Sequence, residues 1–186
     1  MGGKELVVCV SAMSGTLRKK YAKRLKGVGG ELTLEWSDRC TCLVLETAVL
    51  SPKLLICLAQ GRPIAKPSWL DLLLSQVEAN KKRPHSSGEE DVTTFLPSLH
   101  EHLPDVQSEV MPSMSSRELL PRNERRSLLA GVHLIYVIKS TYTKSEKVVL
   151  ECGGTAEFQP TLTRIRKAVS AAKERGEKPV LVTGGV

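Results

Sequence analysis

A helix followed by two glycines and a short strand occurs twice in this chain. The two copies read LKGVGGELTLEW at residues 25–36 and VVLECGGTAEF at residues 148–158. Glycine is favoured after a helix because it readily adopts the positive φ of a left-handed cap. A pattern that returns after more than a hundred residues indicates an internal repeat. We therefore interpret the 186 residues as two copies of one small fold.

The first copy alternates strands with helices, which favours an α/β fold with a small parallel four-stranded sheet flanked by helices. Apolar runs predict strands at Leu6–Val10, Glu31–Trp36, Cys42–Glu46 and within residues 61–67. Helical periodicity and capping residues predict helices at Thr16–Val28, at Lys53–Gln60 after the N-cap Ser51 and Pro52, and at Trp69–Lys81. The second helix is apolar on nearly all sides, so we expect it to be buried.

The second copy is predicted to be shorter than the first. We expect order to return at Arg117–Leu129, strands at Val132–Ile138, Thr155–Phe158 and Pro179–Val182, and a helix at Ser145–Cys152. Compared with the first copy, it lacks the buried helix, the last strand and the last helix. We therefore expect a second repeat that is truncated at its C-terminal end.

The charge distribution predicts two basic modules joined by an acidic connector. The net charge is +7, and residues 85–116 hold six acidic residues and no Lys or Arg. We assign residues 1–83 to the first repeat, 84–116 to a linker rich in Pro and Ser, and 117–186 to the second repeat. Four apolar linker residues are expected to anchor part of it to a module: Phe95, Leu96, Leu99 and Leu103. The basic modules indicate anionic partners.

Several classes of function find no support in the sequence. No apolar run is long enough to span a membrane, and five cysteines without regular spacing indicate a reducing compartment. Cys40 and Cys42 lack the further ligands that a zinc site needs, and His100 and His102 are interpreted as surface residues. The motifs of nucleotide hydrolases, esterases and metalloproteases are missing. We expect no metal, no cofactor, no membrane partner and no catalytic activity.

Lys53 and Ser11 are the candidate anion-binding residues. Lys53 stands in the first turn of an apolar helix, where its charge adds to the partial positive charge of the helix N-terminus. Ser11 ends the first buried strand, and ligands gather at the carboxyl ends of parallel strands. A surface lysine passing a buried helix is the plainer interpretation of Lys53. Ser14-Gly15 is a rival to Ser11 as the phosphate-binding element.

The first helix carries six cations and no acidic residue, which suggests a second kind of contact. Arg18, Lys19 and Lys23 are candidates for binding DNA or phosphate. The plainer interpretation is a solvated basic face. The two interpretations remain open at this point.

The sequence resembles a tandem of BRCT repeats. The resemblance rests on LVVCVS, the helix ending in VGG, CTCLVL, SPKLLICLAQG, GRPIAKP and the Trp of KPSWLDLLL, and it is strongest over residues 1–84. In this family, phosphate is bound by a hydroxyl at the end of the first strand, the next backbone N–H, and a Lys at the start of the second helix. The matching residues are Ser11, Ala12 and Lys53. Many members have Gly where this chain has Ala12.

The resemblance implies a non-enzymatic adaptor that binds phosphoserine or phosphothreonine on acidic nuclear proteins. Within the family, the chain is most similar to the repeats of a subunit of a complex for DNA double-strand-break repair and checkpoint signalling. This implies a nuclear location, on chromatin at breaks, and contact with a nuclease-ATPase complex through parts of the protein outside this chain. A basic DNA-binding module and a BRCT scaffold that needs no phosphate are the alternatives.

Overall fold

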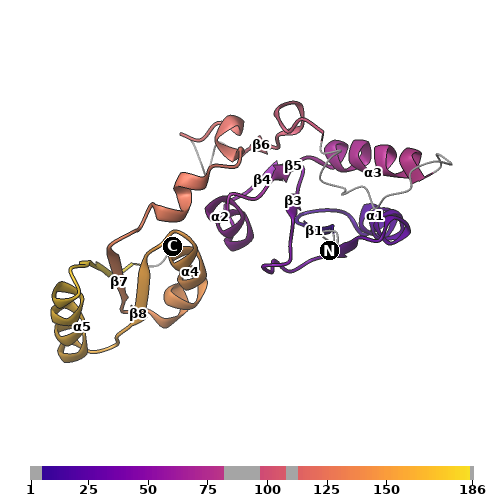
Figure 1. Cartoon of the computed structure of the whole chain (residues 1–186). Coiled ribbons are helices and arrows are strands. Elements are labelled where there is room, and N and C mark those ends of the chain that lie inside the picture. The colour runs from indigo at the N-terminus through magenta and orange to yellow at the C-terminus, as the bar shows by residue number, and fades with distance from the viewer. Residues whose placement is uncertain (1–5, 82–96, 108–112, 185–186) are drawn as a thin grey trace. The chain divides into compact units, whose positions relative to one another are not determined.

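The structure is a computed structural model that describes residues 6–81, 97–107 and 113–184 (Figure 1). Its internal contacts divide the chain into two compact units. The first comprises residues 1–57 and 62–121, and the second comprises residues 58–61 and 122–186. In the described part of the chain, we find no helix with the length and apolarity that a membrane span requires.

The first unit is built on the predicted parallel four-stranded sheet. Its strands are β1 (Val7–Val10), β2 (Glu31–Thr33), β3 (Cys42–Val44) and β5 (Ile64–Ala65), in the spatial order β2-β1-β3-β5. Every pairing is parallel, and Cys9 on the central strand β1 lies opposite Thr33 of β2 and Leu43 of β3. The sheet order brings the carboxyl ends of β1, β2 and β3 to one edge.

Three helices cover this sheet: α1 (Gly15–Val28), α2 (Pro52–Ala59) and α3 (Pro67–Lys81). All four residues of β1 are buried, which requires cover on both faces of the sheet. One face forms a core with α1 and α3, whose buried members include Tyr21, Leu25, Trp69 and Leu73. The helix α2 is buried as expected and contributes side chains outside that core, such as Leu54.

Ion pairs and a buried hydroxyl join α1 to α3, which lie side by side in Figure 1. The guanidinium of Arg24 lies 2.7 Å from Asp71 and 3.0 Å from Glu78, and Lys20 lies 3.4 Å from Asp71. Tyr21 donates a hydrogen bond of 2.8 Å to Asp71. The pKa of its phenol is raised mainly by burial and also by this hydrogen bond. Two of the six cations of α1 therefore serve to hold α3.

Residues 97–107 of the predicted linker pack on the first unit. It forms a short 3₁₀ helix (His100–His102) and the strand β6 (Asp105–Val106), which pairs with β4 (Thr47–Ala48). Trp69 donates its indole N–H to the carbonyl of Pro97 at 3.0 Å, and Lys66 pairs with Asp105 at 3.0 Å. Leu99 packs against the core, which confirms its predicted anchoring role.

The remaining predictions about the linker are only partly covered by the structure. Leu103 is half-buried. Phe95, Leu96 and residue 84, where the linker is predicted to begin, lie outside the described residues. The first compact unit continues to Pro121, beyond the predicted start of the second repeat at residue 117, through the 3₁₀ helix Ser116–Leu119.

The second unit contains a parallel three-stranded sheet in the order β8-β7-β9. Its elements are a 3₁₀ helix (Asn123–Ser127), β7 (Val132–Tyr136), α4 (Lys139–Glu151), β8 (Thr155–Phe158), α5 (Leu162–Glu174) and β9 (Lys178–Val182). The order repeats the β2-β1-β3 part of the first sheet. In the second unit, however, the connection across the central strand is the helix α5.

Two helices of the second unit differ from the sequence predictions. The helix α4 begins at Lys139, whereas the predicted helix began at Ser145. The prediction missed the first turns because they bury only Thr141 and have no apolar stripe. The helix α5 was not predicted at all. Its buried residues Ala168 and Ala172 form an apolar stripe at helical spacing with the half-buried Ile165 and Val169, so this period could have predicted the helix.

The paired glycines of the repeat have the same role in both units. Gly29 and Gly153 adopt left-handed φ angles of 83° and 79°. Gly30 and Gly154 have no space for a side chain: a Cβ atom would lie 2.8 Å from the Leu6 carbonyl oxygen and 2.9 Å from the Leu129 Cβ, respectively. The first glycine ends the helix, and the second allows the next strand to approach the core closely.

A polar network joins the strands of the second sheet. The ring of His133, on the central strand, lies 2.8 Å from a carboxylate oxygen of Glu157 and 2.7 Å from the hydroxyl of Thr155. Thr155 in turn donates to Glu177 at 3.2 Å. Burial raises the pKa of Glu157, but the hydrogen bonds from Gln159 and His133 outweigh it, so the net pKa is lowered. The pKa of Glu177 is lowered mainly by its hydrogen bond with Arg175.

These lowered pKa values predict that the second unit loses stability in acid. A carboxylate whose pKa is lower in the folded state stabilises the fold above its unfolded pKa, and that contribution disappears as the pH falls through the folded pKa. We expect Glu157→Gln to reduce hydrogen-exchange protection of β7 and β8 at neutral pH. The difference from the wild type should shrink as the pH falls below about 4. A difference that is constant between pH 7 and pH 3 would contradict this assignment.

Candidate functional site

Ser11 and Ala12 lie where β1 ends and the chain turns toward α1. The Ser11 N–H donates to the Val44 carbonyl at 3.1 Å, which extends the sheet pairing by one residue. Ala12 has a φ of 52° and is the one residue other than glycine with a positive φ in the described part of the chain. Within the same part, neither the Ser11 hydroxyl nor the Ala12 N–H has a hydrogen-bond partner. Both groups are therefore available to an external acceptor.

The left-handed conformation of Ala12 predicts that Ala12→Gly stabilises the first unit. An L-residue with a side chain is strained in this region and glycine is not, although glycine gains entropy in the unfolded chain. We expect the free energy of unfolding to rise by about 0.5–1 kcal/mol in urea titrations. The control Ala22→Gly, at an exposed position inside α1, should lower it by about 0.5–1 kcal/mol. A loss of stability in Ala12→Gly would exclude strain at this turn.

Ser14, the rival to Ser11, is used as a helix cap. Its hydroxyl accepts the N–H of Leu17 at 3.3 Å and so occupies the N-cap position of α1. One turn into this helix, Arg18 is half-buried, and its Nε has no hydrogen-bond partner among the described residues. A terminal nitrogen of Arg18 lies 3.8 Å from where a Cβ would stand on Gly15, so the guanidinium is close to the start of α1. Arg18 is thus a cation with an unused donor beside this loop.

Lys53 is held at the same edge of the sheet by α2. Ser51 caps this helix as predicted, since its hydroxyl accepts the N–H of Leu54 at 3.3 Å. The Lys53 ammonium donates to the carbonyl of Leu34 and lies 3.9 Å from a carboxylate oxygen of Glu35. The Lys53 side chain is 28% exposed, whereas that of Glu35 is 89% exposed. The contact with Glu35 is a weak surface ion pair that a stronger anion can replace.

The strand register relates Lys53 to Ser11. Thr33 lies opposite Cys9, so Leu34 follows β2 at about the level where β1 reaches Val10. Neighbouring strands are about 4.8 Å apart, so the Leu34 carbonyl that accepts from the Lys53 ammonium follows the strand next to β1. Burial and the neighbouring Cys40 raise the pKa of Cys9 to about 12, while the charge of Lys53 acts in the opposite direction. The structure gives no direct contact between Ser11 and Lys53, and their sharing of one phosphate stays a prediction.

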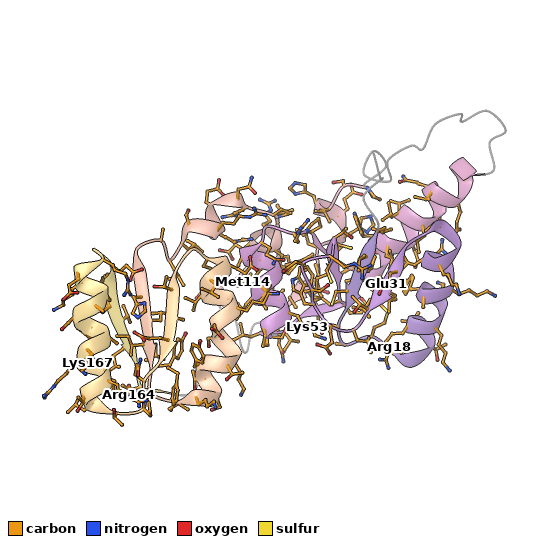
Figure 2. The ribbon with its side chains drawn as sticks, turned by 60° about the horizontal axis from the view of Figure 1, so that its bottom comes forward. Arg18, Glu31, Lys53, Met114, Arg164 and Lys167 are labelled. Atoms are coloured by element: carbon orange, nitrogen blue, oxygen red, sulfur yellow. The ribbon has the colours of Figure 1, made fainter. Side chains whose placement is uncertain are left out.

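The other candidate groups make no comparable cluster. The five cysteines are all buried as free thiols, and burial raises the pKa of Cys42 to about 12. Over the described residues, no group of three or more His, Cys, Asp and Glu side chains is arranged to bind a metal ion. On α1, Lys19 and Lys23 are exposed (Figure 2 labels their neighbour Arg18). Their contact with DNA stays a prediction.

Comparison with known proteins identifies relatives of the chain. Residues 4–74 match the family described as the BRCA1 C Terminus (BRCT) domain. Nibrin of Gallus gallus is 25% identical over 178 residues, which cover 96% of this chain and 20% of that protein. Nibrin of Mus musculus is 28% identical over 155 residues, which cover 82% of this chain and 18% of that protein. The chain therefore spans about a fifth of the length of these relatives.

A solved structure supports the fold beyond the matched segment. The BRCT5-BRCT6 domains of S. pombe Brc1 align with 97% of this chain and 77% of that chain, with a TM-score of 0.63 and 15% sequence identity. At this identity the alignment speaks for the fold alone. It agrees with the two parallel sheets described above and with the strand order that they share. The chain is similar to nibrin, and residues 4–74, within its first repeat, match the BRCT domain family.

Proposed function

We propose that the first repeat binds phosphoserine or phosphothreonine at the edge formed by Ser11, Ala12 and Lys53. The observation that supports the proposal is the pair of unused donors at the end of β1, the Ser11 hydroxyl and the Ala12 N–H. The Leu34 carbonyl, which accepts from the Lys53 ammonium, follows the neighbouring strand at the same edge of the sheet. The resemblance to phosphate-binding BRCT repeats assigns these three residues to the same task.

Each group has a distinct part in holding the phosphate. The Ser11 hydroxyl and the Ala12 N–H, which have no partner among the described residues, donate to two of its oxygens. The Lys53 ammonium, reinforced by the N-terminus of α2, neutralises part of a charge of about −2. Arg18 supplies a further positive charge with terminal N–H donors, because its guanidinium lies close to the start of α1.

At the level of the cell, the proposed role is that of a non-catalytic adaptor. The similarity to nibrin supports a place in DNA double-strand-break repair and checkpoint signalling, and hence in the nucleus on chromatin. The partners would be phosphorylated acidic nuclear proteins. Contact with a nuclease-ATPase complex would be made by regions of the full-length protein outside this chain.

The experiment that tests the proposal is a binding assay on degenerate peptide libraries. One library carries a fixed phosphoserine or phosphothreonine, and its counterpart carries the unmodified residue. We expect the whole chain to bind only the phosphorylated library. Arg18→Gln should weaken this binding severalfold, since a hydrogen bond to a charged group contributes about 1.5–3 kcal/mol and the guanidinium is partly screened.

The matched control is Lys19→Gln, which removes one charge from an exposed position on the same helix. It should bind as the wild type does. Equal binding of the two libraries would refute phosphate recognition. Equal losses in Arg18→Gln and Lys19→Gln would assign binding to the overall charge of α1 instead.

A further inference from the structure

A basic groove on the second unit has no part in the proposed phosphate site. It is lined by one stripe of α5 together with the end of β8, and its residues are Glu157, Gln159, Arg164, Lys167, Ala168, Ala171 and Arg175. The two alanines form a floor of small side chains between the cations. Figure 2 labels Arg164 and Lys167, which lie on α5 one turn apart. The groove depends on α5, which occupies a connection that is a loop in the first repeat.

The charges in this groove favour an anionic ligand. Arg164 and Lys167 are exposed, and neither makes an ion pair within the described part of the chain. Glu157 is engaged, because it accepts hydrogen bonds from Gln159 at 2.7 Å and lies 2.8 Å from His133. Arg175 pairs with Glu177 at 2.7 Å and marks the far end of the groove. No acidic residue lies in the first turn of α5, so the helix N-terminus adds to the positive potential.

The shape and chemistry of the groove distinguish between anions. From Arg164 to Arg175 the stripe extends about 16 Å along the helix, which corresponds to the rise of about five base pairs. A site for a single phosphate would present hydroxyl and backbone N–H donors that converge on one point. This groove instead presents cations spaced along the helix, with alanine side chains between them. Its lining has no aromatic side chain on which the bases of a single strand could stack.

We propose that the α5 groove binds the phosphate backbone of duplex DNA without reading its sequence. The contacts are ionic, with Arg164 and Lys167 as the principal cations. The small alanine side chains allow the DNA backbone to approach the helix closely. Such binding weakens steeply with salt, because each neutralised phosphate releases counterions. This site shares no residue with the proposed phosphopeptide site, and the two proposals are tested independently.

The test uses the whole chain and a fluorescein-labelled DNA duplex of two helical turns. Fluorescence anisotropy measures the affinity for this duplex at salt concentrations between about 50 and 200 mM. We expect Arg164→Gln/Lys167→Gln to lower the affinity at 50 mM salt by about tenfold or more, and to reduce the salt slope by about 1.8. Neither substitution should unfold α5, since Arg164 in its first turn opposes the helix dipole and Lys167 is exposed. Circular dichroism and thermal unfolding check this.

The matched control is Arg166→Gln/Lys173→Gln, which removes two charges from exposed positions of α5 outside the groove. It should retain its affinity within about threefold. Equal losses in the two double variants, or no loss in either, would overturn the proposal. The proposal would also be overturned if inorganic phosphate displaced the duplex more effectively than chloride does at equal ionic strength. That result would indicate a site for a discrete phosphate. Lys19→Gln/Lys23→Gln tests the rival surface on α1, and a loss confined to that variant would also overturn the proposal.

Discussion

Replacing Lys53 with Met should weaken binding of a phosphorylated peptide by about tenfold to a hundredfold. The side chain of Met keeps the apolar stem that passes α2 but lacks the ammonium that neutralises the phosphate. A charge-assisted hydrogen bond contributes about 1.5–3 kcal/mol, and each 1.4 kcal/mol changes an affinity about tenfold. Fluorescence polarisation with a phosphopeptide selected from the library, and with its unmodified form, measures the effect.

Two further variants distinguish a local effect of Lys53 from one of net charge. Lys23→Met removes a charge from an exposed position on α1 and should leave phosphopeptide binding unchanged. Glu35→Gln removes the carboxylate that lies 3.9 Å from the Lys53 ammonium, and it should tighten binding severalfold because phosphate no longer displaces an anion. If Lys53→Met binds as tightly as the wild type, the ammonium does not take part in recognition. If Glu35→Gln weakens binding, the carboxylate does not compete with the phosphate.

Replacing Trp69 with Ala should produce the largest loss of stability in the first unit. Its side chain is 1% exposed and packs in the core that α1 and α3 form on the sheet. Removing a buried aromatic side chain costs about 3–5 kcal/mol, since the transfer free energy is lost and a cavity remains. Urea unfolding of the whole chain, with a probe confined to the first unit, measures this loss. A change below about 1 kcal/mol would mean that the core collapses around the missing ring.

Trp69→Phe separates the packing of this residue from its hydrogen bond. Phe retains most of the buried ring but cannot donate to the Pro97 carbonyl, which Trp69 contacts at 3.0 Å. We expect a smaller loss of about 1 kcal/mol or more, depending on how much ring volume is restored. We also expect faster hydrogen exchange in residues 98–107. Unchanged exchange there would show that the β4-β6 pairing and Lys66–Asp105 suffice to hold the segment.

The first repeat was predictable because its signals are local and strong. A continuous apolar strand must be covered on both faces, as β1 is, and the Ser51 cap and the glycine after α1 mark helix ends through backbone chemistry. The second repeat was less predictable. Its helix α5 has an apolar stripe at helical spacing, formed by Ile165, Ala168, Val169 and Ala172, but two of these four side chains are alanines, which add little hydrophobicity.

The candidate site shows the same division. Lys53 and Ser11 stood out because one begins an apolar helix and the other ends a buried strand, so each was visible from its neighbours in the chain. The use of Ser14 as a helix cap, the unused donor of Arg18 and the carboxylate of Glu35 beside Lys53 were not visible. These features depend on which side chains meet across loops.

By itself, the sequence determined the parallel α/β fold of the first repeat and the existence of a second copy, and it predicted Ser11, Ala12 and Lys53 as phosphate-binding residues. Periodicity, caps and paired glycines act over a few residues, so they can be recognised in the sequence. Only the tertiary structure decided that α3 engages two cations of α1, that Trp69 holds residues 97–107, and that α5 presents Arg164 and Lys167 over alanines. Such pairings join residues far apart in the chain, and their energies depend on distances that exist only once the chain is folded.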